Sequence, residues 1–215
     1  VPVIIELHTI PAFFRRRFLC SLKQCRLVVA LTEPMHEELL TLGIDPAKVI
    51  LAHDGVDLAR FSNIKDEQNI YTKYSLPSEV PLIGYVGQLQ SMGLSKGIPE
   101  LLAAAKELRG MIPNFTFVIA GGPIDTAKSL RQSLHEVLLP HIRFLGPIPP
   151  DDVPSLLRLC DVLIYPAPAS NHPFYRRDTS PLKIFEYMAA ARPIVAANIP
   201  TLQGVLDMSN AFLIP

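Results

Sequence analysis

From residue 81 onward, short apolar runs alternate with segments of helical periodicity, and this alternation constrains the fold more than any other feature of the sequence. The runs are nearly continuously apolar, so they predict strands that are covered on both faces. Strands separated by helices pair in parallel through crossover connections, which predicts a doubly wound α/β domain with a parallel sheet. The expected strands span residues 82–86, 115–120, 142–145, 161–165, 194–197 and 212–214, and the expected helices span 99–109, 126–139, 151–159 and 181–191.

The residues before this domain show the same alternation over a shorter length. Thr32 can cap a helix there and Gly43 can end it. The polar stretch 63–80 lacks clear periodicity apart from a short helix expected near Tyr71, so it predicts a connection between two domains. In the first domain, strands are expected at 3–7, 26–31 and 48–51 and helices at 11–23 and 33–42.

Composition excludes several classes of protein. Of the 215 residues, 49% are hydrophobic and 19% are charged, so the chain is too apolar to be disordered. The 20 basic residues match the 20 acidic ones, which argues against nucleic acid as a partner. No apolar run reaches the roughly 18 residues of a transmembrane segment. Three cysteines are too few for a disulfide framework, so we expect reduced thiols, a cytoplasmic location and no metal site.

The residues that follow each strand form the candidate site, because ligands of open α/β sheets bind at the carboxyl ends of the strands. Gly87 follows the first strand of the second domain, and Lys96 with Gly97 precedes the next helix. Free N–H groups and a lysine at a helix start suit a phosphate or a pyrophosphate. A plain β-to-α turn with a solvated lysine explains the same residues equally well. The string is neither a P-loop nor the dinucleotide-binding glycine pattern.

Glu186 lies among apolar neighbours on a helix that Asp178, Thr179 or Ser180 can cap. A carboxylate in such surroundings needs a partner or water. The sequence leaves two partners open, a pair of ligand hydroxyls or a structural arginine.

Taken in order, these segments resemble glycosyltransferase family 4 (glycosyl transferase group 1), the retaining nucleotide-sugar enzymes of GT-B fold. Residues 180–197 are similar to the E-x7-E signature region of that family, and Asp178 and Glu186 have its spacing. The other segments that resemble family motifs are 5–9, 50–57 with Phe61, 84–87 with Lys96-Gly97, 117–122 and 143–146.

The resemblance covers nearly the whole chain, but family members run longer at both ends. The chain begins at Val1 without a signal-peptide pattern, so we expect a fragment that starts within a domain. The expected organisation is part of an N-terminal, acceptor-side Rossmann-like domain at 1–62, a connection at 63–80 and a nucleotide-sugar-binding Rossmann-like domain at 81–215 that lacks its C-terminal end.

The resemblance implies that a sugar moves from a UDP-, GDP- or ADP-sugar to an acceptor with retention and without a metal or other cofactor. The implied acceptor is a sugar, a lipid-linked molecule or a small molecule, and a lipid acceptor would imply contact with the inner face of a membrane. Alternatives are a GT-B epimerase or phosphorylase, or a degenerate nucleotide-sugar-binding module without turnover.

The resemblance also implies roles for individual residues. Lys96 would hold the diphosphate, and Glu186 would accept hydrogen bonds from the ribose hydroxyls. Asp178 would hold the hydroxyls of the donor sugar, and His8 would touch that sugar near its anomeric carbon. The remaining implied donor-binding positions are Gly87, Gln88, Gly121, Gly122, Ile148, Ser180 and Leu182.

Three positions depart from the family pattern. Gln88 stands where the family has a basic residue, and Asp178 is one methylene shorter than the usual glutamate. Ala191 stands where glycine is usual, which costs about 1 kcal/mol if the site needs a positive φ. Arg176 and Arg177 could supply the charge that Gln88 lacks, or the loop that carries them is a plain mobile surface loop.

Overall fold

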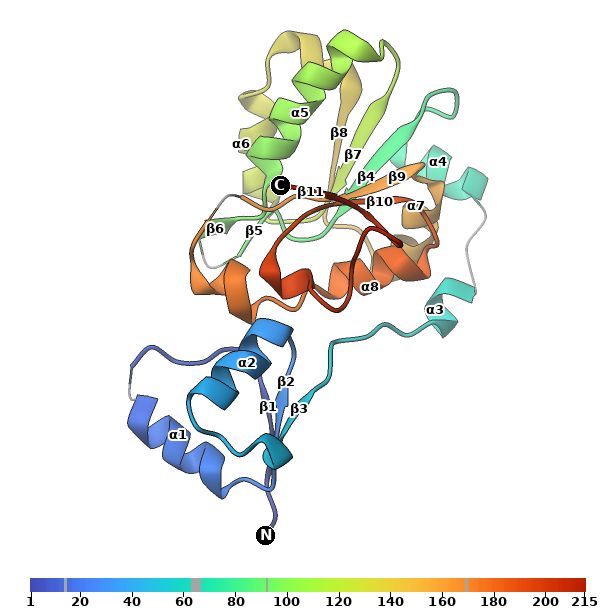
Figure 1. The fold of residues 1–215 in the computed structure, drawn as a ribbon. Coiled ribbons are helices and arrows are strands. Elements are labelled where there is room, and N and C mark those ends of the chain that lie inside the picture. The colour runs from blue at the N-terminus through green and yellow to red at the C-terminus, as the bar shows by residue number, and fades with distance from the viewer. Residues whose placement is uncertain (14, 63–66, 92, 169) are drawn as a thin grey trace. The chain divides into compact units, whose positions relative to one another are not determined.

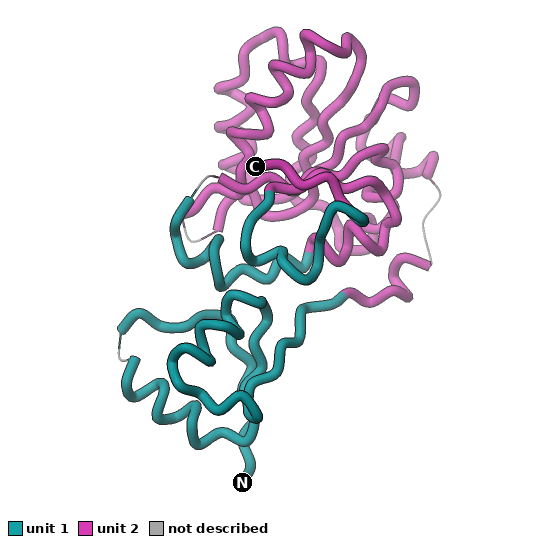
Figure 2. Tube along the Cα trace, in the orientation of Figure 1, with its two compact units in different colours: residues 1–55, 169–182, 198–210 teal, residues 56–168, 183–197, 211–215 magenta. Residues whose placement is uncertain are grey.

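The computed structural model describes residues 1–13, 15–62, 67–91, 93–168 and 170–215. By contacts, the chain groups into two compact units (Figure 2). Unit 1 comprises residues 1–55, 169–182 and 198–210, and unit 2 comprises residues 56–168, 183–197 and 211–215. Two late stretches of chain therefore group with the N-terminal residues, whereas the sequence assigns them to the second domain. The domain limits at 62 and 81 stay a prediction.

Some residues within the predicted segments lie outside the described part of the chain. They are Phe14 in the expected helix 11–23 and residues 63–66 in the expected connection. The rest of that connection contains the expected short helix, α4 (Glu67–Tyr74).

Unit 1 is built on a parallel sheet of three strands in the order β1-β2-β3. Leu22, Val28, Met35 and Leu39 are fully buried in its core. The Thr32 hydroxyl accepts the N–H of Met35 at 3.2 Å, which confirms the expected helix cap. The elements are β1 (Ile4–Leu7), α1 (Arg15–Gln24), β2 (Leu27–Ala30), α2 (Glu33–Thr41), β3 (Val49–Leu51), 3₁₀ turns at Pro46–Lys48 and Pro200–Leu202, and a π-helical turn at Phe174–Asp178.

Unit 2 contains a six-stranded parallel sheet in the order β11-β10-β9-β4-β7-β8, which confirms the predicted doubly wound α/β fold (Figure 1). The chain runs outward from β4 through β7 to β8 and then returns to the other side of β4 as β9, β10 and β11. The strands are β4 (Leu82–Val86), β7 (Thr116–Ala120), β8 (Ile142–Gly146), β9 (Val162–Tyr165), β10 (Ile194–Ala197) and β11 (Phe212–Ile214).

The strand order of this sheet reverses between β4 and β9. In doubly wound sheets, ligands bind at such a reversal, outside the carboxyl ends of the strands. In unit 2 this place lies next to Gly87 and Pro166, the residues that follow β4 and β9. The fold therefore indicates the carboxyl edge of the unit 2 sheet as the place of a ligand-binding site.

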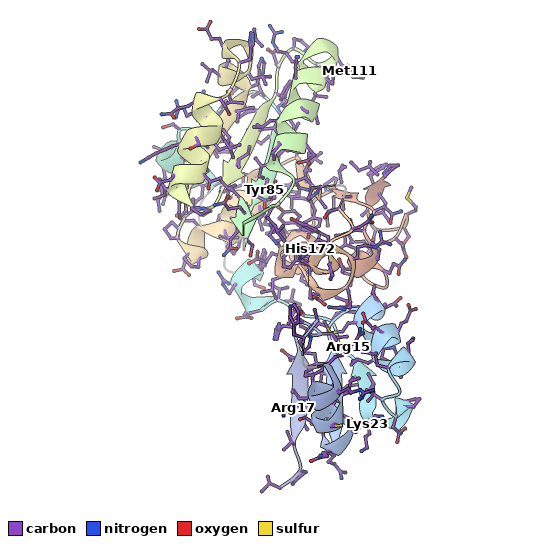
Figure 3. The ribbon with its side chains drawn as sticks, turned by 90° about the vertical axis from the view of Figure 1, so that its left-hand side faces the viewer. Arg15, Arg17, Lys23, Tyr85, Met111 and His172 are labelled. Atoms are coloured by element: carbon purple, nitrogen blue, oxygen red, sulfur yellow. The ribbon has the colours of Figure 1, made fainter. Side chains whose placement is uncertain are left out.

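Helices cover both faces of the sheet, with α5 and α6 on one side of β4, β7 and β8 and with α4 and α7 on the other (Figure 1). Tyr85 of β4 packs into the core beneath α5 and is 1% exposed (Figure 3). The helices are α3 (Ala59–Ser62), α5 (Ile98–Met111), α6 (Ile124–Gln132), α7 (Val153–Leu159) and α8 (Leu182–Ala189), with 3₁₀ turns at Glu136–His141 and Pro150–Asp152.

The predicted helix 126–139 is wrong in one respect, because the chain leaves helical geometry after α6. The Ser133 hydroxyl donates to the carbonyl of Leu130, and His135 Nδ1 accepts the N–H of Val137 and starts a separate 3₁₀ turn. A short hairpin of β5 (Gln90–Ser91) and β6 (Leu94–Ser95) was not predicted. In the described part of the chain, none of the helices has the length and hydropathy that a membrane-spanning helix needs.

Candidate functional site

Two glycines close the carboxyl edge of the sheet in unit 2. Gly87 donates its N–H to the carbonyl of Ala120 at 2.8 Å, and Gly121 donates its own to the carbonyl of Gly146 at 2.8 Å. Gly121 has a φ of 142°, and a Cβ there would fall 1.7 Å from the carbonyl oxygen of Gly87. Main chain therefore packs directly on main chain at this edge, which leaves no room for a side chain between the two strand ends.

A hydrogen bond joins the loop after β4, which carries Gln88, to the loop after β7, which carries Gly122. The carbonyl of Gly122 accepts the N–H of Leu89 at 2.7 Å, which fixes the chain just beyond Gln88. Gln88 is exposed, and its main-chain carbonyl oxygen accepts a hydrogen bond from the Tyr85 hydroxyl. Ile148 lies two residues beyond β8 and is half-buried.

Lys96 lies at the start of α5, beside the place where the strand order reverses. Its N–H donates to the carbonyl of Leu89 at 3.1 Å, so the β5–β6 hairpin returns the chain to the end of β4. A Cβ on Gly97 would fall 2.7 Å from the carbonyl carbon of Pro166, so α5 begins against the main chain that follows β9. The Lys96 amine is half-buried, and desolvation lowers its pKa to about 8.

Lys183, on the first turn of α8, is a candidate residue that the sequence predictions missed. Its Nζ donates to the Tyr85 hydroxyl at 2.8 Å and lies 4.3 Å from the centre of the Tyr85 ring and 5.6 Å from that of Tyr165. A Cβ on Gly87 would fall 2.4 Å from this Nζ. The amine thus lies over the ends of β4 and β9, the two strands that flank the reversal.

The surroundings of Lys183 disfavour its charge. Burial lowers its pKa to about 7, and the positive charge of Lys96 acts in the same direction, whereas Glu186 opposes both. The sequence held a signal for this residue, because Lys183 and Glu186 are three positions apart on an otherwise apolar helix and therefore share a face.

Glu186 is half-buried, and desolvation raises the pKa of its carboxyl group, while the charges of Arg60 and Lys183 act in the opposite direction. The Arg60 guanidinium donates to the carbonyl of Pro150 at 2.7 Å. Among the described residues, no hydrogen bond or ion pair reaches the Glu186 carboxylate. Of the two partners that the sequence left open, the structural arginine is therefore not in contact.

Asp178 lies in unit 1 and is held by a cluster of polar groups. Its carboxylate accepts Nε and Nη2 of Arg177, the latter at 3.0 Å, and the Thr9 hydroxyl at 2.8 Å. Arg177 also donates to Glu38 at 2.8 Å and to the carbonyl of Ile10 at 2.9 Å. Arg177 is therefore engaged by two carboxylates of its own unit, which argues against its expected use as a substitute for the charge missing at Gln88.

The loop that carries these residues contains buried side chains. Tyr175 is 4% exposed, and Thr179 is buried as well. Arg176 is exposed. The segment from His172 to Thr179 is therefore partly buried, and the alternative of a plain mobile surface loop stays a prediction.

The predicted site residues divide between the two units. Unit 2 brings together Lys96, Gly87, Gln88, Gly121, Gly122 and Glu186 around the carboxyl edge of its sheet, with Ile148 beyond β8. Unit 1 holds His8, Asp178, Ser180 and Leu182. His8 is exposed, with Nε2 3.0 Å from the Glu6 carboxylate.

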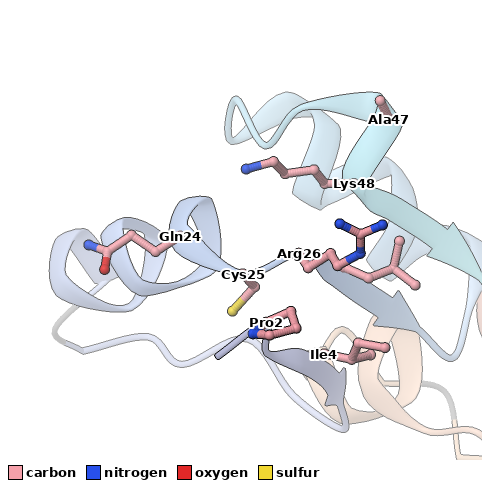
Figure 4. Close-up of a pocket in the computed structure, with 8 residues that line it drawn as sticks. Pro2, Ile4, Gln24, Cys25, Arg26, Ala47 and Lys48 are labelled. Carbon is pink, nitrogen blue, oxygen red and sulfur yellow. The ribbon is translucent and has the colours of Figure 1, made fainter.

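A groove of about 570 Å³ lies elsewhere in unit 1, at the amino ends of β1 and β2 (Figure 4). This edge is opposite to the one that binds ligands in open α/β sheets. The Lys48 ammonium donates to the carbonyl of Lys23 at 2.8 Å. We assign the groove no function. Its lining residues are Pro2, Ile4, Gln24, Cys25, Arg26, Leu27, Ala47 and Lys48.

Metal ligands do not cluster in the described ranges. No three side chains of His, Cys, Asp or Glu gather there as they would around a metal ion. We therefore assign no metal centre.

Comparison with known proteins gives one family. The family model described as "Glycosyl transferases group 1" matches residues 80–215. The putative teichuronic acid biosynthesis glycosyltransferase TuaH of Bacillus subtilis (strain 168) is 28% identical over 198 residues, which cover 87% of this chain and 45% of that protein. The D-inositol 3-phosphate glycosyltransferase of Jonesia denitrificans is 31% identical over 205 residues, which cover 90% of this chain and 46% of that protein. The chain thus spans less than half the length of these relatives.

Solved structures share the fold. The glycosyltransferase from Rickettsia africae ESF-5 matches 98% of this chain and 55% of its own with a TM-score of 0.75 and 22% identity. Anabaena Alr3699/HepE in complex with UDP-glucose matches 99% of this chain and 58% of its own with a TM-score of 0.71 and 21% identity. These likenesses confirm the expected fold class, α/β of GT-B type.

Proposed function

The chain belongs to the group 1 glycosyl transferases, and on that premise we propose that the protein transfers a sugar from a nucleoside-diphosphate sugar to an acceptor. We further propose that transfer retains the anomeric configuration and needs no metal ion. The first donor to test is UDP-glucose, because a structure of the same fold was solved with that molecule.

One observation carries this proposal. The strand order of the unit 2 sheet reverses at an edge where glycines leave the main chain without side chains. Lys96 at the start of α5 and the half-buried carboxylate of Glu186 adjoin this edge. A helix start and a lysine stabilise the negative charge of a diphosphate, including the charge that grows on it as a leaving group. A carboxylate without a protein partner among the described residues accepts the two hydroxyls of a ribose.

Asp178 is proposed to hold hydroxyls of the donor sugar. An ionised carboxylate has about four acceptor positions. In unit 1, Arg177 and Thr9 together supply three hydrogen bonds to it. Asp178 thus has room for a further donor, and its partners fix its orientation. His8 is proposed to lie near the anomeric carbon.

The acceptor class stays open among sugars, lipid-linked molecules and small molecules. The two relatives described above carry names that point to different products, so they do not select one. We propose that the protein works in the cytoplasm, and that a lipid-linked acceptor would bring it to the inner face of a membrane.

The test begins with binding. UDP, GDP and ADP, each with and without a sugar, are titrated into the protein by calorimetry, with Glu186→Ala as the paired variant. We expect one base to be preferred and its binding to weaken in the variant. Release of nucleoside diphosphate in the presence of an acceptor tests turnover, and NMR of the product tests retention. A chelator added to the same assay tests metal independence. If none of the nucleotides binds, the proposed function is wrong.

A further inference from the structure

Three positive features converge at the reversal of the unit 2 sheet. They are the amine of Lys183, the amine of Lys96 and the amino end of α5, which begins at Ile98. Among the described residues, no ion pair joins Lys183 to a carboxylate. A bound anion stabilises positive charge in partly buried surroundings, whereas without one a lysine there loses its proton more readily.

The position of the Lys183 amine is fixed by contacts with two tyrosines. The Tyr85 hydroxyl donates to the carbonyl of Gln88 and accepts from Lys183 Nζ at 2.8 Å. The faces of Tyr85 and Tyr165 attract the ammonium, as aromatic rings attract cations. An ammonium has three N–H donors, and Tyr85 takes one, so two remain for a ligand.

Gly87 leaves the space through which a ligand can meet this amine. A Cβ there would fall 2.4 Å from Lys183 Nζ, so any other residue would displace the lysine. The next residue, Gln88, is exposed and uncharged. The cation at this point of the sheet edge is therefore supplied by α8 and not by the strand end.

We propose that Lys183 binds the diphosphate of the nucleotide sugar together with Lys96, and so supplies the charge that Gln88 does not. This inference rests on the proposed function, because that function supplies the diphosphate. Two lysines on separate elements hold a diphosphate from two directions, which a single lysine at the start of α5 does not do.

The protonation of Lys183 follows from the same geometry. The groups that face it are Tyr85 of β4, Tyr165 of β9, Lys96 before α5 and Glu186 of its own helix. Without a ligand its pKa is about 7, so at pH 8 most of the amine is neutral. A bound diphosphate favours the charged form, so binding at pH 8 takes up a proton.

The experiment compares Lys183→Met with the wild type and with Lys106→Met, a matched change at an exposed lysine of α5. Each protein is titrated with the preferred nucleoside diphosphate, with the nucleoside of the same base and with inorganic pyrophosphate, by calorimetry or ligand-observed NMR. We expect Lys183→Met to weaken binding of the diphosphate about 10- to 100-fold and to abolish pyrophosphate binding. Nucleoside binding should stay within about twofold of the wild type, and Lys106→Met should change nothing.

A second variant distinguishes loss of the Lys183 charge from a structural effect of the substitution. Gln88→Arg in the Lys183→Met background returns a cation to the same edge, so it should recover most of the lost diphosphate affinity. In the wild type, diphosphate affinity should fall as the pH rises from 7 to 9, and Lys183→Met should flatten the part of this profile near pH 7.

The outcomes separate the two proposals. Equal diphosphate affinity in the wild type and Lys183→Met overturns the role of Lys183 and leaves the proposed function standing. Loss of nucleoside and diphosphate binding together, without recovery by Gln88→Arg, shows a structural role and also overturns it. A wild type that binds no nucleoside diphosphate overturns the proposed function and this inference with it.

Discussion

The Tyr187 hydroxyl accepts the N–H of Val86 at 3.0 Å and donates to the carbonyl of Ile164 at 3.4 Å. One side chain of α8 thereby joins the carboxyl-terminal parts of β4 and β9, the strands on either side of the reversal. Tyr187 is fully buried, and burial raises the pKa of its hydroxyl well above the usual value, so the group stays protonated and can donate. Lys183 lies one turn earlier on the same helix, so its position depends on these two hydrogen bonds of Tyr187.

Tyr187→Phe should therefore lower the free energy of unfolding by about 1–3 kcal/mol, because it leaves the buried N–H of Val86 without its acceptor. Urea denaturation of the protein measures the change. The matched control is Tyr71→Phe, since no hydrogen bond of the Tyr71 hydroxyl occurs among the described residues. Equal stability of the two variants would contradict the prediction.

Ala191→Gly should stabilise the protein by about 1 kcal/mol, because Ala191 follows α8 with a φ of 54°, where glycine is unstrained. The opposite sign is expected for Ala104→Gly, an exposed position inside α5 at which glycine costs about 1 kcal/mol. Paired urea titrations decide the matter. A loss of stability at both positions would rule out strain at Ala191.

Gly121→Ala should destabilise the protein and abolish nucleotide binding, because its Cβ would fall 1.7 Å from the carbonyl oxygen of Gly87. Gly146→Ala is the control, since its φ of 68° is also positive but a Cβ there meets nothing within 4 Å. The control should cost only the strain of about 1–2 kcal/mol. Calorimetry with the preferred nucleoside diphosphate completes the test, and preserved binding in Gly121→Ala would refute it.

Glu186→Gln should weaken binding of the ribonucleotide by roughly 10-fold, because an amide oxygen is a poorer acceptor for the two ribose hydroxyls than a carboxylate. The 2′-deoxynucleotide should bind the two proteins more equally. Burial raises the pKa of Glu186, so wild-type affinity should fall as the pH drops through that raised pKa. The affinity of Glu186→Gln should not fall in this way at low pH. If the wild type and Glu186→Gln show the same dependence of affinity on pH, a contact between Glu186 and the ribose is contradicted.

The stability of the ligand-free protein should rise with pH above neutrality through the two lysines. Their pKa values in the folded state, about 7 for Lys183 and about 8 for Lys96, lie below the unfolded value of 10.5. Between these limits the unfolded chain binds more protons than the folded one, so the free energy of unfolding increases with pH. Lys183→Met should show a smaller rise between pH 7 and pH 9 than the wild type. If the free energy of unfolding rises equally with pH in the wild type and in Lys183→Met, the Lys183 amine is fully solvated in the folded protein.

Most of the fold could be predicted because its signals are local. The strands of unit 2 are short apolar runs, and the predicted limits agree with those of β4, β10 and β11 at both ends. Ala191 has a φ of 54°, a condition that the sequence raised only because the resembling family has glycine at this position. The break after α6 was missed because it depends on side-chain bonds of Ser133 and His135, which compete with the helix only once the chain turns there.

The site was predictable only in part, because its remaining features depend on contacts between distant residues. Lys183 gains its place from Tyr85, 98 residues away in the chain. The pairing of Arg177 with Glu38 joins residues 139 apart. Neither relationship leaves a spacing that a sequence pattern can register.

The two aromatic rings beside Lys183 have a practical consequence. The sequence contains no tryptophan and six tyrosines, so tyrosine is its intrinsic fluorophore, and Tyr85 and Tyr165 both lie next to the amine. A ligand that converts this amine to an ammonium changes the immediate surroundings of both phenols. The emission of the unlabelled chain should therefore report when the sheet edge is occupied.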